Sequence, residues 1–556
     1  MNLRIVCVPC CVMFIFCGCK KNNGNDPGPP TQPSIFNFGS LSVNGVFTGN
    51  TYYGVNTNPI VKFSFTAPID HSSVVNAVTL KNSSGVTVPY NSSFQNNDST
   101  IVIQPTSPLS FITAYSMSVS TGLKSKSNGS LQSGVTINFT TSIDSSDKFP
   151  IISDDSLLSL VQHQTFSYFW DFGHPVSGLA RERNASGETV TTGGSGFGIM
   201  AIPVAISRNF ISRSDGLARV QKIASFLRNT AQHFHGAFSH WMNGSTGVVV
   251  PFAQNDDGAD IVETSYLMMG LLTARQYFNG SDMAETNLRS DINALWNGVE
   301  WDWFRQNGKN VLYWNWSPNS AWAVNVPVQG WNETLITYAL AASSTTHGVP
   351  KAVYDSGFTR NGAMKNGSLY YGYTLPLGEA YGGPLFFEHY SFLGINPNGL
   401  SDANANYQTQ TLNHTKINFE YCKANPKNYY GYSSLCWGLT ASDIQNGYTA
   451  SSPTNDVGVI APTAAISSIP YTPVESMQAL KFFYYKLGDK IWGQYGFTDA
   501  FDLNDTWFAD SYLAIDEGPI IVMIENYRTG LPWSLFTSCP EIKSGLVSLG
   551  FSAPYL

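Results

Sequence analysis

The sequence has few charged residues. Of its 556 residues, only 12% are Asp, Glu, Lys or Arg, against about 25% in a typical soluble protein. The charges that are present leave a net charge of −8 at pH 7. Because nucleic-acid binding needs a basic footprint, this composition excludes a nucleic-acid partner.

Uncharged polar residues and aromatic residues take the place of the missing charges. Asn, Ser, Thr and Gly are abundant, and the aromatic residues include 13 Trp and 28 Tyr. A neutral polar surface with many aromatic rings suits an uncharged ligand that carries many hydroxyl groups. The composition therefore favours a carbohydrate ligand.

Cysteine is concentrated at the N-terminus, which reads MNLRIVCVPCCVMFIFCGC. The basic start, the apolar run and the small Gly18 before Cys19 predict a secretory signal at 1–19. The apolar run is too short for a membrane-spanning helix. Phe16-Cys17-Gly18-Cys19 resembles a bacterial lipobox, which implies that Cys19 becomes a lipidated N-terminus. We expect a cell-envelope protein that a lipid anchor holds at a bacterial membrane, periplasmic or surface-exposed; a plain cleaved signal is the alternative.

Only three cysteines follow the signal, namely Cys422, Cys436 and Cys539. In an exported protein Cys422 and Cys436 could form a disulfide. The odd number leaves at least one free thiol, and a buried free thiol is an equally good interpretation of each. No His and Cys spacing resembles a zinc site.

The next two segments differ sharply in composition. Residues 20–33, KKNNGNDPGPPTQP, contain no apolar side chain and predict a flexible tether. Residues 34–146 contain short β-branched runs such as KFSFTAPI and STIVIQP, separated by Asn, Gly, Ser and Pro, which predict a small β-sandwich. This segment resembles the bacterial Ig-like domains that often precede secreted enzymes. We expect it to be a spacer; glycan binding by its loops is the alternative.

Helical periodicity dominates the rest of the chain, with about twelve helices joined by aromatic-rich loops. Segments such as GFGIMAIPVAI and IVETSYLMMGLL are apolar on nearly every side and must be covered all round. Others, such as GLARVQKIASFLRNTAQ, are amphipathic. Inner helices wrapped by outer helices predict a toroidal (α/α)6 barrel over 147–556. A helical solenoid is the competing architecture, but the sequence has no fixed-period repeat.

Acidic residues crowd the start of one apolar helix, in QNDDGADIVETSYLMMGLL. At 100° per residue, Asp256, Asp260 and Glu263 share one helical face, and no Lys or Arg lies three or four residues on to pair with them. Acids in a first turn can simply cap the helix, and this alternative applies to Asp256 and Asp257 and, less strongly, to Asp260. Glu263 lies too far into the helix to cap it. Since a buried unpaired glutamate is costly, we expect Glu263 to line a solvated cavity.

Other acids occupy similar positions. Glu333 follows Trp331 at the start of another apolar helix, and Asp516 and Glu517 precede Gly518-Pro519, where a helix can begin. A barrel of this kind would gather such carboxylates in one pocket. We expect aromatic residues to ring that pocket, namely Trp241, Trp331, Phe387, Tyr390 and Trp507. Converging acids and aromatic platforms are what glycosidic cleavage requires, without a metal or another cofactor.

Long motifs carry a family resemblance. The helical part of the chain contains the motifs SHWMNGSTGVVVPFAQNDDGADIVETSYLMMGLL, GWNETLITYALAASSTTHGV, GGPLFFEHYSFLGINPNGL, SPTNDVGVIAPTAAISSIPYTP and YLAIDEGPIIVMIENYRTGLPW. Over roughly 154–556 these motifs resemble the glucoamylase-like domain of glycoside hydrolase family 144. The resemblance implies an (α/α)6 barrel that cleaves β-1,2-glucan with inversion. It places in the substrate cleft the acids Asp256, Asp260, Glu263, Glu333 and Asp516.

The resemblance also suggests individual roles. Glu333 is the best candidate for the general acid and Asp516 for the base, although the neighbouring Glu517, where many relatives are expected to carry Gln, leaves open which of these two acts. Arg183 matches an arginine near the family's substrate subsites, but a lone arginine is more often a surface ion-pair partner. For His240 and His389, substrate hydrogen bonding competes with a place in the core.

The sequence therefore predicts an exported lipoprotein that hydrolyses β-1,2-glucan or its oligosaccharides. An α-glucan hydrolase, a non-catalytic glycan-binding lipoprotein and a phosphorolytic enzyme are the alternatives. The glycine-rich run at 193–198 follows no strand of the dinucleotide-binding kind, so we expect no phosphate-binding loop there.

Overall fold

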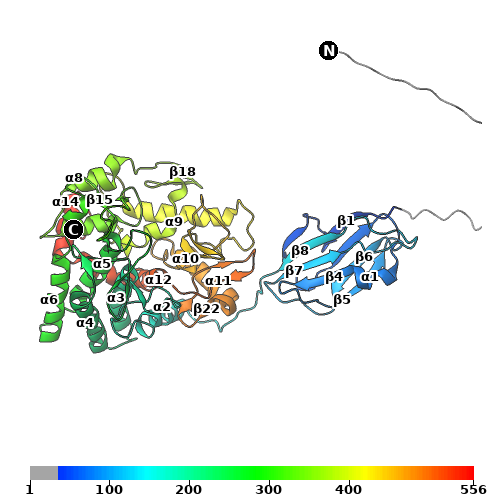
Figure 1. Ribbon diagram of the computed structural model, residues 1–556, viewed down its shortest axis with the longest axis horizontal. Helices are drawn as coiled ribbons and strands as arrows, with labels where there is room; N and C mark the ends of the chain where they lie inside the picture. Colours follow the sequence, from blue (N-terminus) through cyan, green and yellow to red (C-terminus); the bar gives the residue numbers. More distant parts are fainter. Residues whose placement is uncertain (1–34) are drawn as a thin grey trace, which may run out of the picture. The chain divides into compact units, whose positions relative to one another are not determined.

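The structure, a computed structural model, describes residues 35–556 (Figure 1). The predicted signal at 1–19, including Cys19, and the predicted tether at 20–33 lie outside the described residues. The chain forms two compact units. The first comprises the segment that ends at Asn50, Asn58–Pro108 and Ser116–Asn138, and the second comprises Thr51–Thr57, Leu109–Tyr115 and Phe139–Leu556.

The N-terminal region is rich in β-structure, as predicted. Its elements are β1 (Phe38–Val43), β2 (Thr51–Val55), β3 (Val61–Phe65), α1 (His71–Ala77), β4 (Val78–Asn82), β5 (Tyr90–Gln95), β6 (Thr100–Pro105), β7 (Ala114–Val119) and β8 (Val135–Thr141). The strands form two four-stranded sheets, ordered β1-β3-β6-β5 and β2-β8-β7-β4. In β3, Val61, Phe63 and Phe65 are buried in alternation with Lys62 and Ser64, which is the pattern of a strand with one face in a core.

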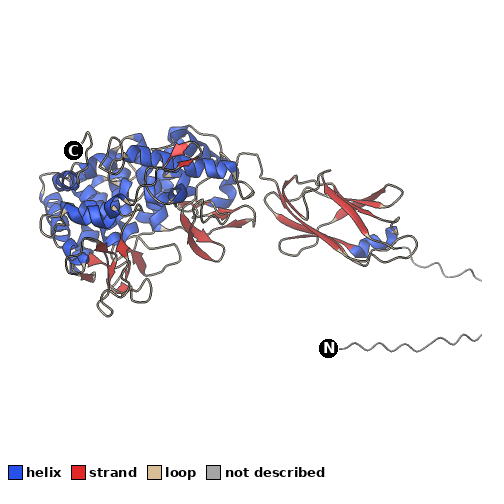
Figure 2. Ribbon diagram, turned by 90° about the horizontal axis from the view of Figure 1, so that it is seen from above, coloured by secondary structure: helices blue, strands red, loops and turns tan. Residues whose placement is uncertain are grey.

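The second region is mainly helical (Figure 2). Its α-helices are α2 (Asp154–Trp170), α3 (Thr192–Ser207), α4 (Arg213–Asn229), α5 (Ile261–Tyr277), α6 (Met283–Asn297), α7 (Leu335–Ser343), α8 (Lys351–Val353), α9 (Tyr407–Ala424), α10 (Pro462–Ile466), α11 (Pro473–Ile491), α12 (Ala514–Arg528), α13 (Leu531–Thr537) and α14 (Pro540–Leu549). Shorter helical turns are η1 (Trp301–Arg305), η2 (Tyr354–Phe358), η3 (Arg360–Gly362), η4 (Ala380–Gly382), η5 (Leu385–Glu388) and η6 (Ser391–Leu393).

The helical region also contains short strands, most of which lie on one side of it (Figure 2). They are β9 (Thr189–Thr191), β10 (His233–Phe234), β11 (Ala237–Phe238), β12 (Trp241–Asn243), β13 (Val249–Val250), β14 (Ala259–Asp260), β15 (Leu312–Tyr313), β16 (Asn315–Trp316), β17 (Pro327–Val328), β18 (Leu369–Tyr370), β19 (Tyr373–Thr374), β20 (Ala441–Ile444), β21 (Gly447–Ala450), β22 (Trp492–Gly493), β23 (Gly496–Phe497), β24 (Phe501–Asp502) and β25 (Trp507–Phe508).

Three helices form the buried centre of the helical region. Nearly every residue of α3, α5 and α12 is buried, as their all-round apolar sequences predict. Helix α3 packs against both α5 and α12, α5 also packs against α7, and α12 also packs against α10. Helix α4 is amphipathic, with Val220, Ile223 and Leu227 buried, and it packs against α6.

Glycine allows α3 and α5 to approach each other closely. A Cβ atom on Gly196 would lie 2.2 Å from the carbonyl oxygen of Tyr266, and one on Gly270 would lie 2.2 Å from the carbonyl oxygen of Gly196. Only a residue without a Cβ fits such contacts. The glycine-rich run at 193–198 therefore serves helix packing.

The structure corrects three expectations. Helix α5 begins at Ile261, so Asp256 precedes the helix and does not share its acidic face. The helical periodicity of the sequence also predicts a helix that begins near Gly382, but this segment forms the short turns η5 and η6. Within residues 35–556 all three cysteines are buried free thiols, so the disulfide between Cys422 and Cys436 is wrong. No helix in this range is long and apolar enough to span a bilayer.

Candidate active site

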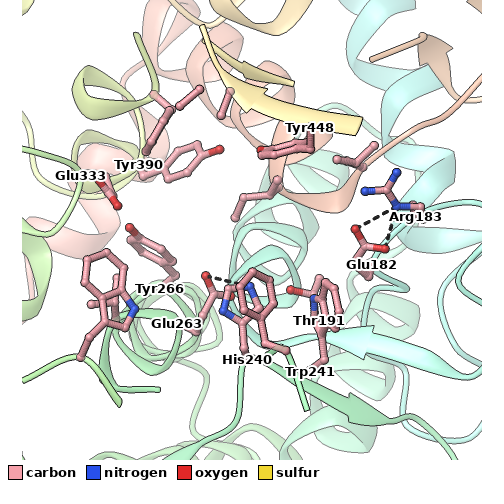
Figure 3. A pocket seen from close by; sticks show the side chains of 18 residues that line it. Glu182, Arg183, Thr191, His240, Trp241, Glu263, Tyr266, Glu333, Tyr390 and Tyr448 are labelled. Carbon is pink, nitrogen blue, oxygen red and sulfur yellow. Dashed lines mark hydrogen bonds and ion pairs between the residues drawn. The ribbon is translucent and has the colours of Figure 1, made fainter. Parts of the chain in front are cut away.

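A cavity of about 490 Å³ lies in the helical region (Figure 3). Its walls come from segments that are far apart in the sequence: the loop before β9, helix α5, the turn before α7, the β20–β21 hairpin and the start of α12. The lining residues are Glu182, Arg183, Thr191, His240, Trp241, Phe252, Val262, Glu263, Tyr266, Trp314, Glu333, Phe386, Tyr390, Ala441, Tyr448, Ala450, Leu513 and Ile515. The cavity thus combines carboxyl groups with many aromatic rings.

Glu263 lines the cavity from the first turn of α5. The backbone N–H of Gly193 donates to Oε2 of Glu263 at 2.7 Å, and Nε2 of His240 lies 3.9 Å from its Oε1. A Cβ on Gly193 would lie 2.5 Å from Oε2, so a glycine at this position leaves room for the carboxylate. The expectation that Glu263 lines a cavity is confirmed.

Asp260 lies behind Glu263 and has two structural tasks. Its Oδ1 accepts hydrogen bonds from the N–H groups of Val262 and Glu263, which caps α5. Its Oδ2 lies 3.0 Å from Nδ1 of His240 and accepts a bond from Nε1 of Trp314 at 3.3 Å. Asp260 is fully buried and thereby fixes the orientation of two side chains that line the cavity.

The charges of Asp260, Glu263 and His240 affect the pKa values of His240 and Glu263. Burial alone lowers the pKa of His240, but the carboxylates of Glu263 and Asp260 outweigh burial and raise this pKa to about 9. Burial raises the pKa of Glu263, although His240 acts in the opposite direction. Near neutral pH the cavity wall therefore holds an imidazolium ion between two acidic groups.

Glu333 enters the cavity from the turn before α7. The hydroxyl group of Ser391 donates to the backbone carbonyl of Glu333 at 2.5 Å and holds this turn in place. Burial raises the pKa of Glu333 to about 7. Figure 3 shows Glu333 and Glu263 reaching the open space from two sides with Tyr266 between them. Burial, and then the charges of both carboxyl groups, raise the pKa of Tyr266, whose hydroxyl has no hydrogen-bond partner among the described residues.

Asp516 lies behind the cavity wall. Leu513 and Ile515, just before it in the chain, line the cavity, whereas Asp516 is only 4% exposed. Burial raises the pKa of Tyr390 and Tyr448, which are both lining residues, and the charge of Asp516 raises these pKa values further.

Asp516 and Glu517 serve different surroundings. Burial raises the pKa of both carboxyl groups well above the ordinary range. Besides burial, the charge of Glu517 raises the pKa of Tyr168 and Tyr512, which do not line the cavity, whereas the charge of Asp516 raises the pKa of tyrosines that do. Of this pair, Asp516 is therefore the residue closer to the cavity.

Arg183 lines the cavity but is already paired. Its Nε lies 3.0 Å from Oε2 of Glu182, and its Nη1 lies 3.1 Å from Oδ2 of Asp443 in β20. The hydroxyl group of Ser511 also donates to Asp443 at 2.6 Å. These bonds tie the β20–β21 hairpin, which includes the lining residue Tyr448, to the loop that carries Glu182 and Arg183.

The structure brings many of the predicted residues together. Six of them line the cavity, namely Arg183, His240, Trp241, Glu263, Glu333 and Tyr390. Asp260 and Asp516 contact or act on lining residues from behind. Asp256 also lies near this group, because its charge acts on His240 and Glu263, and Asn315 donates to its Oδ1 at 3.0 Å.

Two predicted substrate contacts belong to the core instead. Trp331 is buried, packs on Tyr407, and donates through Nε1 to Oε1 of Glu388 at 2.9 Å. His389 is buried with Nε2 2.9 Å from the hydroxyl oxygen of Ser468, and burial lowers its pKa to about 3. Neither residue lines the cavity, so the core alternative holds for His389 and the expected position of Trp331 in the pocket ring is wrong.

Two predicted aromatic platforms also lie elsewhere. Phe387 packs against Phe386 and the backbone at Gly383, and it is Phe386, one residue earlier, that lines the cavity. Trp507 lies in β25, paired with Asp502 of β24, and is not a lining residue. A one-residue shift in a short 3₁₀ turn cannot be read from periodicity.

Sequence reasoning missed several lining residues, namely Glu182, Thr191, Phe252, Tyr266, Trp314, Phe386 and Tyr448. The position of Glu182 could have been predicted, because an acidic residue directly beside Arg183 can form an ion pair with it. Tyr266 lies one turn after Glu263 on the same helix, which also indicates a shared face. Tyr448 lies in the β20–β21 hairpin and Trp314 lies between β15 and β16, and local sequence does not determine the orientation of either segment.

Within residues 35–556, no group of three or more His, Cys, Asp and Glu side chains is arranged to hold a metal ion. The groups available for chemistry in the cavity are carboxyl groups, an imidazolium and aromatic rings.

Comparison with protein families identifies two regions. A family model described as "Putative glucoamylase" matches residues 325–540, and one described as a bacterial Ig-like domain matches residues 40–141. The second match agrees with the two β-sheets of the N-terminal region.

Individual relatives give more detail. The chain is 45% identical over 418 residues to the exo β-1,2-glucooligosaccharide sophorohydrolase (non-reducing end) of Parabacteroides distasonis, a match that covers 71% of this chain and 58% of the relative. It is 52% identical to the crystallised endo-β-1,2-glucanase of Chitinophaga pinensis, covering 73% of this chain and 100% of that one, with a TM-score of 0.71. A β-1,2-glucanase structure from P. distasonis is 36% identical, covering 93% of this chain and 74% of that one, with a TM-score of 0.70.

Proposed function

Because the chain belongs to the glucoamylase-like family of glycoside hydrolases, family 144, we propose that it hydrolyses β-1,2-glucan or β-1,2-glucooligosaccharides. The single observation that carries the proposal is the presence of two carboxyl groups with raised pKa values, Glu333 and Glu263, in one cavity with aromatic walls. Relatives named as β-1,2-glucan hydrolases supply the linkage.

Glu333 is the proposed general acid. Protonation of the departing glycosidic oxygen needs an acid that still holds its proton near neutral pH. Burial gives Glu333 a pKa of about 7, and the carboxyl group faces the cavity. The glycosidic bond breaks as the oxygen takes this proton, which leaves Glu333 ionised.

Asp516 is the proposed base in an inverting mechanism, in which water attacks the anomeric carbon from the face opposite the departing group. Because Asp516 lies behind the wall, the water proton would reach it through a second water molecule or a sugar hydroxyl group. Glu263, with Asp260 and His240 behind and beside it, would position the substrate and stabilise the charge that develops. Trp241 and Tyr390 supply ring surfaces on which sugar rings can pack.

A substrate comparison tests the proposed activity. The mature protein is incubated with linear β-1,2-glucan or with starch, with and without inorganic phosphate, and new reducing ends are counted. We expect reducing ends from β-1,2-glucan alone, without a need for phosphate. Activity on starch alone, a requirement for phosphate, or tight glucan binding without turnover would each overturn the proposal in favour of one of the alternatives.

We also propose that the helical region is an (α/α)6 barrel. The contacts that support it run from α3 to α5, from α5 to α7, from α7 to η6, from η6 to α12, and from α12 back to α3, with α10 beside α12. Amphipathic helices such as α4 and α11 would form the outer layer. An experimental structure in which the helices form an open solenoid would contradict this architecture.

The lipid anchor remains a separate proposal based on the sequence of 1–19. If Cys19 is lipidated, the protein should fractionate with membranes and incorporate labelled fatty acid in a bacterial host. Replacement of Cys19 by serine should release it to the soluble fraction. Unchanged fractionation and the absence of label in the natural protein would favour a plain cleaved signal.

A further inference from the structure

Asp499 is a buried carboxyl group in the loop before β24, and it is only 4% exposed. Its Oδ2 accepts a hydrogen bond from the backbone N–H of Asp443 at 2.6 Å. The N–H group of Asp499 itself donates to the carbonyl oxygen of Ser511 at 2.9 Å. The other carboxyl oxygen, Oδ1, finds no donor among residues 35–556. The side chain is therefore held firmly with one oxygen unsatisfied.

Asp516 is a second buried carboxyl group with one unsatisfied oxygen. It is also 4% exposed, and its Oδ2 likewise lacks a donor in the described part of the chain. The side chains of Asp499 and Asp516 lie within hydrogen-bonding reach of each other. Two ionised carboxylates can only accept hydrogen bonds, so this contact forms only when one of them carries a proton.

The surrounding charges do not neutralise the pair. Asp443 of β20 and Glu517 of α12 face it with the same negative sign. Arg183 is the cation that acts on Asp499, but its guanidinium is already bonded to two other carboxylates. Burial is the main cause that raises the pKa values of Asp499 and Asp516, and their mutual repulsion adds to it.

The remaining neighbours connect the pair to the cavity. Tyr390 and Tyr448 line the cavity, and the charge of Asp516 adds to burial in raising the pKa of both. On the other side, Glu182 lines the cavity and shares Arg183 with Asp443. The pair is thus one layer from the substrate space, inside a network that reaches the wall at several points.

We propose that Asp499 is a positioning residue for Asp516: the two carboxyl groups share one proton, and the pair retains the single negative charge that takes up a proton from the attacking water. This inference rests on the proposed hydrolytic function.

The atoms of the step balance. The water oxygen bonds to the anomeric carbon as the glycosidic C–O bond breaks, Glu333 gives its proton to the departing oxygen, and the proton of the water ends on the aspartate pair. The pair then holds two protons and Glu333 holds none, and exchange with solvent restores both.

The shared proton can be tested without any turnover. Infrared difference spectra at neutral pH should contain the carbonyl stretch of a protonated carboxyl group that is absent from both Asp499→Asn and Asp516→Asn. Removal of either partner abolishes the shared proton, so one folded variant is enough. If the band persists in a folded variant, the proposal is wrong, whether or not the enzyme cleaves glucan.

A pH profile tests the consequence for catalysis. In Asp499→Asn the amide oxygen can still accept from Asp443, and the amide nitrogen can donate to Asp516. The shared proton stabilises the singly charged pair, and an amide N–H is a weaker donor than a carboxyl O–H, so Asp516 in the variant should take up a proton at higher pH than the pair does. We expect the acidic limb of kcat/KM to move up by about half a pH unit or more, with KM nearly unchanged. The matched control is Asp502→Asn, because Asp502 is also buried but is bonded to Asn504; its limb should not move.

These outcomes separate the two proposals. A lower kcat or lower stability in Asp499→Asn with an unmoved acidic limb would show a merely structural role and overturn the inference. If the wild-type enzyme fails to cleave β-1,2-glucan but the infrared band disappears as expected, the proposed function fails and the shared proton stands.

Discussion

The carboxyl group of Glu333 lies at the centre of the proposed chemistry, because it faces the cavity and keeps its proton near neutral pH. In Glu333→Gln we expect kcat to fall by about 10²–10⁴-fold, since the amide cannot protonate the departing oxygen. The dissociation constant for a β-1,2-glucooligosaccharide, measured by calorimetry, should change little. The exposed Glu379→Gln is the control and should retain full activity. A wild-type rate in Glu333→Gln would remove this residue from the mechanism.

The pKa of Glu333 gives a second prediction. The acid acts only when protonated, so kcat should decline as pH rises through about 7. For stability, the unfolded chain ionises this group above 4.5, whereas the folded protein holds the proton up to about 7. The contribution of the proton to stability is therefore complete below 4.5 and is lost as pH rises toward 7.

Glu333→Gln cannot ionise and should escape that loss. The difference in Tm between this variant and the wild type should move in favour of the variant between about pH 5 and about pH 8, as measured by calorimetry. An identical difference at both pH values would show that burial does not perturb this carboxyl group.

Gly193 provides a test of how precisely Glu263 must be placed. A Cβ at this position would lie 2.5 Å from Oε2 of Glu263 and 2.8 Å from the Tyr266 ring. Gly193→Ala should therefore displace both side chains and lower kcat/KM at least about tenfold, the effect of about 1.4 kcal/mol. Gly298→Ala, where the nearest atom is 3.2 Å away, is the control. Full activity in Gly193→Ala would show that the cavity tolerates this displacement.

Single residues could be predicted from the sequence where a physical cost singled them out. Glu263 lies in the first turn of α5 and not deep in the helix as expected, yet the cost of burying a carboxyl group with no Lys or Arg three or four residues away still predicts a cavity. The same reasoning failed for Trp331 and His389, because a buried Trp–Glu or His–Ser hydrogen bond joins residues that are distant in the sequence. No local pattern indicates such partners.

At the scale of elements, the β20–β21 hairpin contributes Tyr448 to the cavity and is tied to Arg183 through Asp443. Tyr448→Ala should raise KM about tenfold, because a ring contact with a sugar is removed. Tyr448→Phe should retain most of the affinity. Tyr527→Ala, an exposed tyrosine at the end of α12, is the control. An unchanged KM in Tyr448→Ala would indicate that substrate does not reach this hairpin.

Elements were predictable in proportion to the strength of their periodicity. The all-round apolar segments of α3 and α5 are the buried helices that the sequence predicts. The start of α5 was placed too early because Asp256 fits the helical face, yet Asp260 caps the helix from outside. The segment after Gly382 forms two 3₁₀ turns, and the positive φ of Gly382 and Gly383 keeps these two residues out of a helix.

At the scale of the whole molecule, composition and motif order indicated a β-rich segment followed by a helical domain. Family comparison assigns an Ig-like domain to 40–141, and relatives cover the helical region. The way in which distant segments meet in one cavity could not be derived from the sequence, because it depends on how the whole helical region packs. Glu182 and Tyr448 line the same space although more than half of the helical region separates them in the chain.

The most direct test of the account follows the anomeric protons by NMR while the mature protein cleaves linear β-1,2-glucan. Direct attack by water on a β-linkage inverts the anomeric carbon, so the account predicts that the α-anomer appears first and equilibrates later, and that Glu333→Gln yields no comparable signal. Initial formation of the β-anomer, or the absence of any new reducing end with the wild-type protein, would contradict it.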